Sequence, residues 1–267
     1  MSPLRFLATH ALRLTARDIH IQHHWVPEAR VKLNSYAHKG YWYLGKKREQ
    51  RSMELCGRLV KPGMLVGEVG GHIGYLSVYF ASLVGPSGQV VVFEPGSNNF
   101  GYTISNLGPF KQVQLLQKGV GDKDGSFTFY EDTLSGQNNS FLSDEESILI
   151  NQQQAVESIK LVARGRIDMV KLDTVFKDRV PDFLKIDAER FELSVLKGAA
   201  QLLATGKPVV MIEVTNDGPE VLQLLADQGY AIFDEAGQKQ SGWTGKRGNY
   251  FCLPKLSKLD PAQVFAA

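Results

Sequence analysis

Apolar runs of strand length alternate along this chain with segments whose apolar residues recur at helical spacing. The stretch Leu65–Gly74 begins as an apolar run and ends in a glycine-rich turn. The next segment, Tyr75–Val84, carries apolar residues at helical spacing and stops at Gly85 and Pro86. A second apolar run, Gln89–Pro95, follows. Because buried parallel strands are apolar on both faces, we predict a strand, a helix and a parallel strand here.

The alternation continues along the rest of the chain and predicts the remaining elements. We expect helices at 96–107, 189–204 and 217–225, and strands at 113–120, 126–130, 158–163, 169–172, 183–187, 209–214, 230–234 and 250–253. The polar segment 132–147 is long enough to be a mobile flap over a site. The pattern therefore predicts an α/β fold, in which a Rossmann-like, seven-stranded, mostly parallel sheet carries helices on both faces and ends in antiparallel strands.

The glycine-rich turn limits which ligand the predicted site can take. It lacks the G-x-x-x-x-G-K-[ST] pattern of a phosphate loop, and no three of its glycines fit the G-x-G-x-x-G pattern of a dinucleotide site. Glu68, Gly70 and Gly74 instead fit the spacing [DE]-x-G-x-x-x-G. An anionic Glu68 would repel a pyrophosphate and attract the sulfonium and ammonium groups of S-adenosylmethionine. A dinucleotide site and a purely structural turn are the alternatives.

Acidic residues at the ends of predicted strands supply the candidate chemistry. Glu94 closes the strand after the glycine turn and can accept hydrogen bonds from two ribose hydroxyls. Asp187 and Glu213 lie at the ends of two later strands, and Glu189 follows in the turn after Asp187. Because the carboxyl ends of parallel strands meet at one edge of a sheet, we expect these carboxylates to cluster. Capping of a helix by acidic residues in its first turn is the structural alternative.

Several longer segments carry a family resemblance. In chain order they read VGEVGGHIGYLS, VVVFEPGSNNF, GVGDKDGSFTFY, VKLDTVF, FLKIDAERFELSVLKGA and KPVVMIEV. These segments resemble the FkbM-type methyltransferases, and the resemblance extends from Tyr43 to Tyr230. The family usually has K-I-D-V-E-G-x-E-x-x-x-L-x-G-A where this chain has KIDAERFELSVLKGA, so Arg190 replaces a glycine. GGHIG likewise replaces G-A-N-I-G, and Glu68 replaces the more common aspartate.

The resemblance implies a class I methyltransferase that uses S-adenosylmethionine as its cofactor. It also implies that the loop after the third strand lies near the adenine, which makes Asp122 a candidate ligand, whereas the letters DKDG alone indicate only a turn. The expected methyl acceptor is a hydroxyl group on a sugar or a secondary metabolite. Our candidate cofactor-binding residues are Glu68, Gly70, Gly71, His72, Gly74, Tyr75, Glu94, Pro95 and Asp122.

The expected reaction is an in-line transfer of the sulfonium methyl group to an oxygen nucleophile. Positioning of the acceptor oxygen should supply most of the rate gain, and a carboxylate should remove the proton. Asp187 is the first candidate for this base or for positioning the acceptor, Glu189 the second and Glu213 the third. His72 lies inside the glycine loop, so we expect it to shape that loop rather than to move a proton.

We predict that the site holds no metal. A divalent cation on the carboxylates, as in catechol-type methyltransferases, is disfavoured by the family resemblance. His20, His23 and His24 have helical spacing, but no carboxylate with ligand spacing accompanies them, so we expect a solvated histidine cluster.

Two other functions stay open. A binding protein could retain the cofactor fold without catalysis, since Arg190 could block the acceptor pocket or instead recognise a carboxylate or phosphate. An NAD-linked oxidoreductase is disfavoured by the glycine spacing and by the lack of a Tyr-x-x-x-Lys pair near the site.

The N-terminal part of the chain is interpreted as an extension, residues 1–55, ahead of a cofactor-binding domain, residues 56–267. Charged residues interrupt its leucines, so no apolar run reaches the length of a signal peptide or a membrane span. We expect an amphipathic helix that packs on its own domain, with a membrane surface or a partner subunit as alternatives. Residues 36–51 are aromatic and then basic, which suits either a wall of the substrate site or a solvated loop.

Composition adds few constraints. The 267 residues are 43% hydrophobic and 22% charged, with a net charge of +2, as in an ordinary globular chain without a strongly basic surface for nucleic acid. Cys56 and Cys252 match no metal or disulfide pattern, which favours a reduced, cytoplasmic location. We therefore expect a small hydroxylated molecule as partner, no nucleic acid and no membrane span, and a homo-oligomer stays open.

Overall fold

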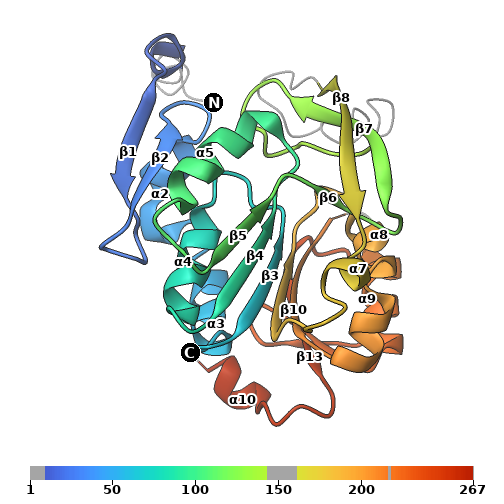
Figure 1. Cartoon of the computed structure of the whole chain (residues 1–267). Helices are drawn as coiled ribbons and strands as arrows, with labels where there is room; N and C mark the ends of the chain where they lie inside the picture. The colour runs from blue at the N-terminus through green and yellow to red at the C-terminus, as the bar shows by residue number, and fades with distance from the viewer. Residues whose placement is uncertain (1–9, 143–160, 216–217, 267) are drawn as a thin grey trace.

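The computed structural model describes residues 10–142, 161–215 and 218–266 (Figure 1). Its centre is a mixed sheet with the strand order β12-β11-β13-β10-β9-β3-β4-β5. The last five strands in this order are mutually parallel. They are β10 (Val209–Val214), β9 (Phe183–Ile186), β3 (Leu65–Val69), β4 (Gln89–Phe93) and β5 (Val113–Leu116).

The other end of the sheet is antiparallel, as the sequence predicts. β13 (Gly248–Pro254) lies between β10 and β11 (Tyr230–Asp234) and runs antiparallel to both. The short strand β12 (Lys239–Gln240) pairs with β11 at the edge. The described residues thus form eight strands in this sheet, and the predicted number of seven is not confirmed. A two-residue polar strand has too little pattern to be predicted.

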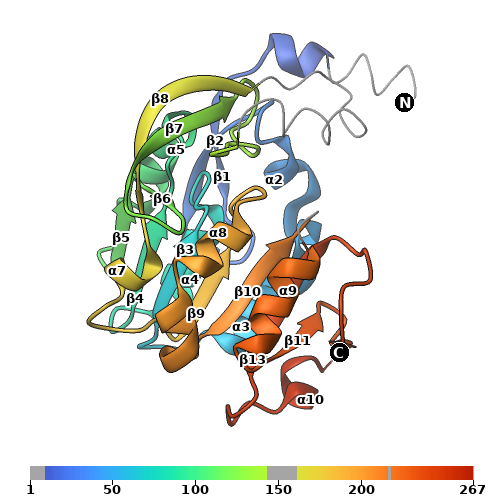
Figure 2. The ribbon, with the colours of Figure 1, turned by 90° about the vertical axis from the view of Figure 1, so that its right-hand side faces the viewer.

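Helices cover both faces of the sheet, as Figures 1 and 2 show. Val90 and Val92 of β4 belong to one hydrophobic core, and Val91 and Phe93 belong to the other. The first core is completed by α3 (Gln50–Leu59), α4 (Tyr75–Val84), α5 (Ser97–Leu107) and α10 (Pro261–Val264). The second is completed by α7 (Leu172–Val175), α8 (Glu192–Lys197) and α9 (Gly218–Asp227).

A second, smaller sheet stands above the main one in Figure 1, with the strand order β6-β8-β7. Its strands are β6 (Gly119–Val120), β8 (Leu161–Val170) and β7 (Gly125–Asp132). The predicted strand 113–120 was therefore wrong as one element, because the polar residues Gln117 and Lys118 lie between β5 and β6. The expected strands 158–163 and 169–172 both fall on the single strand β8, but β8 ends at Val170 and Leu172 already belongs to α7. Residues 158–160 lie outside the described residues. Exposed Arg166 and Asp168 hid the middle of this strand from the apolar pattern.

The predicted helix at 189–204 also differs from the structure. Glu189 and Arg190 have positive φ angles of 48° and 75°, so the chain turns there and α8 begins only at Glu192. A π-helical turn, η2 (Leu202–Gly206), ends the segment before β10. The usual family glycine at position 190 is explained by this left-handed backbone, which glycine adopts without a steric cost.

The N-terminal segment forms β1 (Asp18–Gln22), β2 (Arg30–Asn34), α2 (Lys39–Leu44) and the 3₁₀ turn η1 (Gly45–Lys47). Residues 10–14 are helical, and the rest of the predicted N-terminal helix lies outside the described residues. Val31 and Leu33 share the first hydrophobic core with Phe80 of α4, and Lys32 of β2 exchanges hydrogen bonds with Asn106 of α5, so this segment packs on the helices of that face. Among the described residues, no helix combines the length and the apolar character that a membrane crossing needs.

Candidate active site

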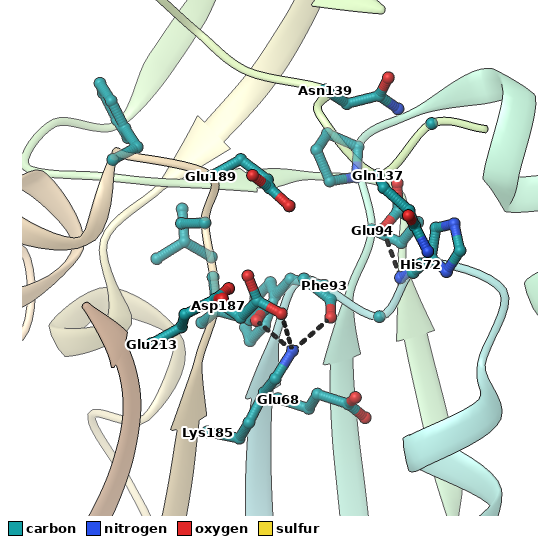
Figure 3. A pocket seen from close by; sticks show the side chains of 18 of the residues that line it. Glu68, His72, Phe93, Glu94, Gln137, Asn139, Lys185, Asp187, Glu189 and Glu213 are labelled. Atoms are coloured by element: carbon teal, nitrogen blue, oxygen red, sulfur yellow. Dashed lines mark hydrogen bonds and ion pairs between the residues drawn. The ribbon is translucent and has the colours of Figure 1, made fainter. Parts of the chain in front are cut away.

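The carboxyl ends of β3, β4, β9 and β10 open into a cavity of about 310 Å³ (Figure 3). This edge is where open α/β sheets bind ligands, and the volume is within the range of small-molecule sites. Nine of the predicted site residues line the cavity: Glu68, Gly70, Gly71, His72, Glu94, Pro95, Asp187, Glu189 and Glu213. The structure therefore brings these nine residues together at one edge of the sheet.

The glycine loop is tightly packed against the neighbouring strands. The backbone N–H groups of Gly70 and Gly71 both donate to the carbonyl oxygen of Phe93, at 3.0 and 3.1 Å. Gly70 has a φ of 82°, and a Cβ atom there would lie 1.9 Å from the carbonyl oxygen of Asp187. Only glycine fits this position, so the loop backbone can approach the end of β9 closely.

Two buried carboxyl groups lie at the base of the cavity. Glu94 accepts hydrogen bonds from the N–H of His72 through Oε2 at 2.7 Å and from the N–H of Gly96 through Oε1 at 2.8 Å. Burial raises the pKa of Glu94 to about 7, although these hydrogen bonds oppose the shift. Burial also raises the pKa of Glu68 to about 7, against the attraction of Lys185. Both oxygens of Glu68 are buried without a hydrogen-bond partner among the described residues.

His72 connects the glycine loop to two other segments. Its Nε2 lies 3.0 Å from the carbonyl oxygen of Ser135, so Nε2 carries the proton. Its Nδ1 then accepts from the hydroxyl of Tyr41 at 3.0 Å. Burial lowers the pKa of His72 to about 3, which keeps the ring neutral. Both ring nitrogens are engaged, and this geometry supports a role in shaping the loop.

A cluster of charged side chains lies on the opposite wall (Figure 3). Lys185 is buried, and its Nζ lies 3.1 Å from Oδ2 of Asp187 and 2.8 Å from the carbonyl oxygen of Gly70. Burial favours the neutral acid at Asp187, but Lys185 and Glu213 outweigh it and lower the pKa of Asp187. The charge of Asp187, together with burial, raises the pKa of Glu213 to about 9. At neutral pH, Asp187 is therefore ionised and Glu213 is protonated.

The third carboxyl group, Glu189, lies in the same cluster. Burial, followed by the charges of Asp187 and Glu213, raises its pKa well above the usual value. One oxygen from each of these three carboxyl groups lies within 4.8 Å of the others, close enough to hold a divalent cation. Lys185 already supplies positive charge to Asp187. The absence of a metal stays a prediction.

Three of the predicted site residues do not line the cavity. Gly74 precedes α4, and Tyr75 stacks on His23 with ring centroids 4.0 Å apart, so Tyr75 holds the N-terminal segment. Asp122 is exposed, and its carboxylate accepts from the hydroxyl of Ser194 at 3.2 Å. The histidine cluster is also not wholly solvated, because His23 is only 1% exposed and contacts the carbonyl oxygen of Tyr75 at 3.0 Å.

Several lining residues were missed or left open by the sequence pattern. Lys185 was missed, although a lysine inside the apolar run FLKID was a usable signal. Tyr41 and Arg48 line the cavity, which favours the substrate-wall interpretation of residues 36–51. The polar loop after β7 contributes Gly136, Gln137, Asn138, Asn139 and Ser140.

A glycine loop after one central strand and an acidic residue after the next are typical of Rossmann-like proteins, which bind their cofactors at this edge of the sheet. Residues 68–232 match the family model of the methyltransferase FkbM domain. This match spans more than half of the chain, and the chain belongs to that family of S-adenosylmethionine-dependent methyltransferases. S-adenosylmethionine is therefore its expected cofactor.

Comparison with solved structures finds methyltransferases of low sequence identity. The FkbM methyltransferase of Methylobacillus flagellatus is 15% identical over 93% of this chain and 59% of its own, with a TM-score of 0.43. The S-adenosylmethionine-dependent O-methyltransferase of Thermotoga maritima is 12% identical over 79% and 67%, with a TM-score of 0.44. The Bacillus cereus O-methyltransferase complex with S-adenosylhomocysteine is 13% identical over 77% and 79%, with a TM-score of 0.40.

None of the curated proteins compared with the chain matches it. Because these TM-scores are low, the membership of the chain in the family rests on the match to the family model alone.

Proposed function

We propose that this chain is an O-methyltransferase that acts on a hydroxyl group of a sugar or a secondary metabolite. The observation that carries the proposal is Asp187, an ionised carboxylate that shares one cavity with the glycine loop and Glu94. Such a carboxylate can accept the proton of a hydroxyl group.

The residues of the cavity fit the expected cofactor. Glu68, the loop of residues 70–72, Glu94 and Pro95 would hold it, with Glu94 available to ribose hydroxyls. Glu68 and Glu94, whose pKa values lie near 7, can take negative charge beside a ligand that carries a sulfonium and an ammonium group. When bound, S-adenosylmethionine supplies a methyl group that is already activated for displacement.

The task left to this chain is to position the acceptor and to receive its proton. Lys185 fixes Asp187 through one oxygen, and the protonated carboxyl of Glu213 lies beside it. Asp187 can then hold the acceptor hydroxyl by a hydrogen bond and take its proton as the oxygen is methylated. Positioning contributes about 7 to 11 kcal/mol when fully realised, and a general base about 10²- to 10⁴-fold in rate.

The order of the candidate bases follows from their protonation. Asp187 is ionised at neutral pH and stays first. Glu189 has a raised pKa and would be a stronger base in its ionised form, so it stays second. Glu213 holds its proton up to a pH of about 9 and stays third. Arg190 does not line the cavity, so the lining of the cavity gives no support to a pocket that Arg190 blocks.

We also propose a cellular location and an oligomeric state for the protein. Cys56 and Cys252 are free and buried, which supports a cytoplasmic location. The chain is also proposed to assemble into a homo-oligomer.

The test is transfer of labelled methyl from S-adenosylmethionine to a panel of hydroxylated sugars and metabolites. Asp187→Asn should lower turnover about 10²- to 10⁴-fold while the protein still binds the cofactor. Asp182→Asn is the matched control, because Asp182 flanks the other end of β9 and accepts the N–H of Leu65 at 2.8 Å. Unchanged turnover in Asp187→Asn would refute the role of Asp187. Cofactor binding without transfer to any hydroxyl would favour a protein without this catalysis.

A further inference from the structure

Three consecutive large apolar side chains are exposed at the end of α2. Trp42, Tyr43 and Leu44 are 36%, 75% and 45% exposed, and the exposed lysines Lys46 and Lys47 follow in η1. We call these five residues the α2 surface. Other exposed large apolar side chains of the described residues have no such neighbour next to them in sequence. A grouped apolar surface of this kind marks an interaction site more often than scattered single residues do.

The α2 surface adjoins the rim of the active-site cavity. Tyr41 precedes it, is only 8% exposed and donates its hydroxyl to His72. Arg48 follows it and lies over the ring of Tyr41 at 4.3 Å, and both residues line the cavity. Residues 42–47 therefore lie between two residues of the cavity wall, and the exposed α2 surface adjoins the cavity.

Positive charge is concentrated in the same segment. Residues 36–51 contain one acidic residue, Glu49, and five basic ones, Lys39, Lys46, Lys47, Arg48 and Arg51, whereas the whole chain carries a net charge of only +2. Glu49 pairs with Arg48 at 3.2 Å. Lys46 lies over the ring of Trp25 at 5.3 Å, and neither lysine of the α2 surface forms an ion pair with a described residue. The segment thus combines an exposed apolar group with uncompensated lysines.

We propose that the α2 surface docks the protein on an anionic lipid bilayer. Tryptophan and tyrosine favour the level of the lipid headgroups, Leu44 can enter the acyl boundary, and the lysines complement lipid phosphates. Binding to a membrane surface scales with the apolar area that is buried and with the attraction of basic residues to anionic lipids, and this segment offers both. A nucleic acid would gain little from Leu44, and the chain outside this segment has no excess of basic residues to follow a phosphate backbone.

The proposal is tested by co-sedimentation of the full chain with vesicles. Vesicles of phosphatidylcholine and phosphatidylglycerol in equal parts should bind the protein, and vesicles of phosphatidylcholine alone should bind it at least tenfold more weakly. Emission of Trp42 should shift to shorter wavelength on binding, and Trp42→Phe should lose this shift. Vesicle binding does not depend on methyl transfer, so the result is independent of the proposed enzymatic function.

Matched double variants locate the docking site. Leu44→Ser with Lys47→Glu should weaken binding at least tenfold, since each basic residue near an anionic surface contributes about fivefold. Leu256→Ser with Lys255→Glu makes the same two changes at another exposed site, where Leu256 is 99% exposed, and should leave binding unchanged. The proposal would be overturned if both double variants lost vesicle binding equally, or if the protein bound both kinds of vesicle equally. It would also be overturned if a single-stranded RNA bound more tightly and displaced the vesicles.

Discussion

At the residue scale, buried charge determines what the cavity can do. Lys185 brings a positive charge into the interior, and through Asp187 it also sets the protonation of Glu213. The sequence pattern identified the two carboxylates because each ends a predicted strand. It could not identify their states of protonation, because these depend on neighbours that come from different strands.

The proton that Glu213 carries beside ionised Asp187 leads to a pH prediction. The raised pKa of Glu213 means that its proton is present below a pH of about 9 and is lost above it. Loss of this proton puts a second negative charge beside Asp187, so wild-type turnover should fall as the pH rises through about 9. Glu213→Gln cannot lose a proton, and it should retain turnover at neutral pH without this decrease. Initial rates between pH 6 and 10.5 check the result, and an unchanged decrease in Glu213→Gln would contradict it.

Arg190 leads to a prediction of stability. Its φ of 75° is strained for any residue except glycine, and one of its guanidinium nitrogens, Nη1, is buried without a hydrogen-bond partner among the described residues. Arg190→Gly should therefore raise the free energy of unfolding by roughly 0.5 to 1 kcal/mol and leave turnover unchanged.

Denaturant unfolding of Arg190→Gly and Arg190→Ala measures this effect. The alanine variant is the control, because it removes the side chain but keeps the strained backbone, so it should be less stable than the glycine variant. A loss of turnover in both variants would show that the arginine contacts the substrate.

At the scale of elements, the loop after β7 depends on one aspartate. Asp132 accepts the N–H groups of Leu134, Ser135 and Gly136 through Oδ1 and that of Asn138 through Oδ2, at 2.7 to 2.9 Å. Burial alone would raise the pKa of Asp132, but these bonds hold it below its usual range. Sequence predicted a polar flap over the site, but it did not show that Asp132 holds the loop together. The loop becomes part of the cavity through its contacts with His72 and with α5, which are distant in sequence.

Removal of this carboxylate should release the loop. Asp132→Ala should weaken binding of S-adenosylmethionine about tenfold and accelerate proteolysis within residues 133–140, because several buried N–H groups lose their acceptor. Asp124→Ala is the matched control, since Asp124 accepts the N–H of Lys171 and the hydroxyl of Thr174 outside the cavity. Limited proteolysis and calorimetry measure both effects, and identical behaviour of the two variants would contradict this role for Asp132.

At the scale of the whole molecule, sequence patterns predicted the elements that are buried on both faces. The parallel strands and the antiparallel end are both present, and apolar runs such as Gln89–Phe93 are typical of strands that are buried on both faces. The smaller sheet and the start of α8 were predicted poorly. The smaller sheet depends on β8, a strand with a charged, exposed face, whereas the start of α8 depends on two residues with left-handed backbone, Glu189 and Arg190. The packing of the N-terminal segment against α4 is a long-range contact without a local signal.

The central claim is that this cavity binds S-adenosylmethionine through Glu94. Calorimetric titration with S-adenosylmethionine and, separately, with NAD tests it most directly, with Glu94→Gln as the variant. Glu131→Gln is the matched control, because Glu131 is also buried and accepts the N–H of Ser97, at the start of α5, but does not line the cavity.

We predict micromolar binding of S-adenosylmethionine, weakened roughly ten- to a hundredfold by Glu94→Gln and unchanged by Glu131→Gln, as expected for loss of hydrogen bonds to a charged group. Binding of NAD in its place, or no effect of Glu94→Gln, would contradict the account.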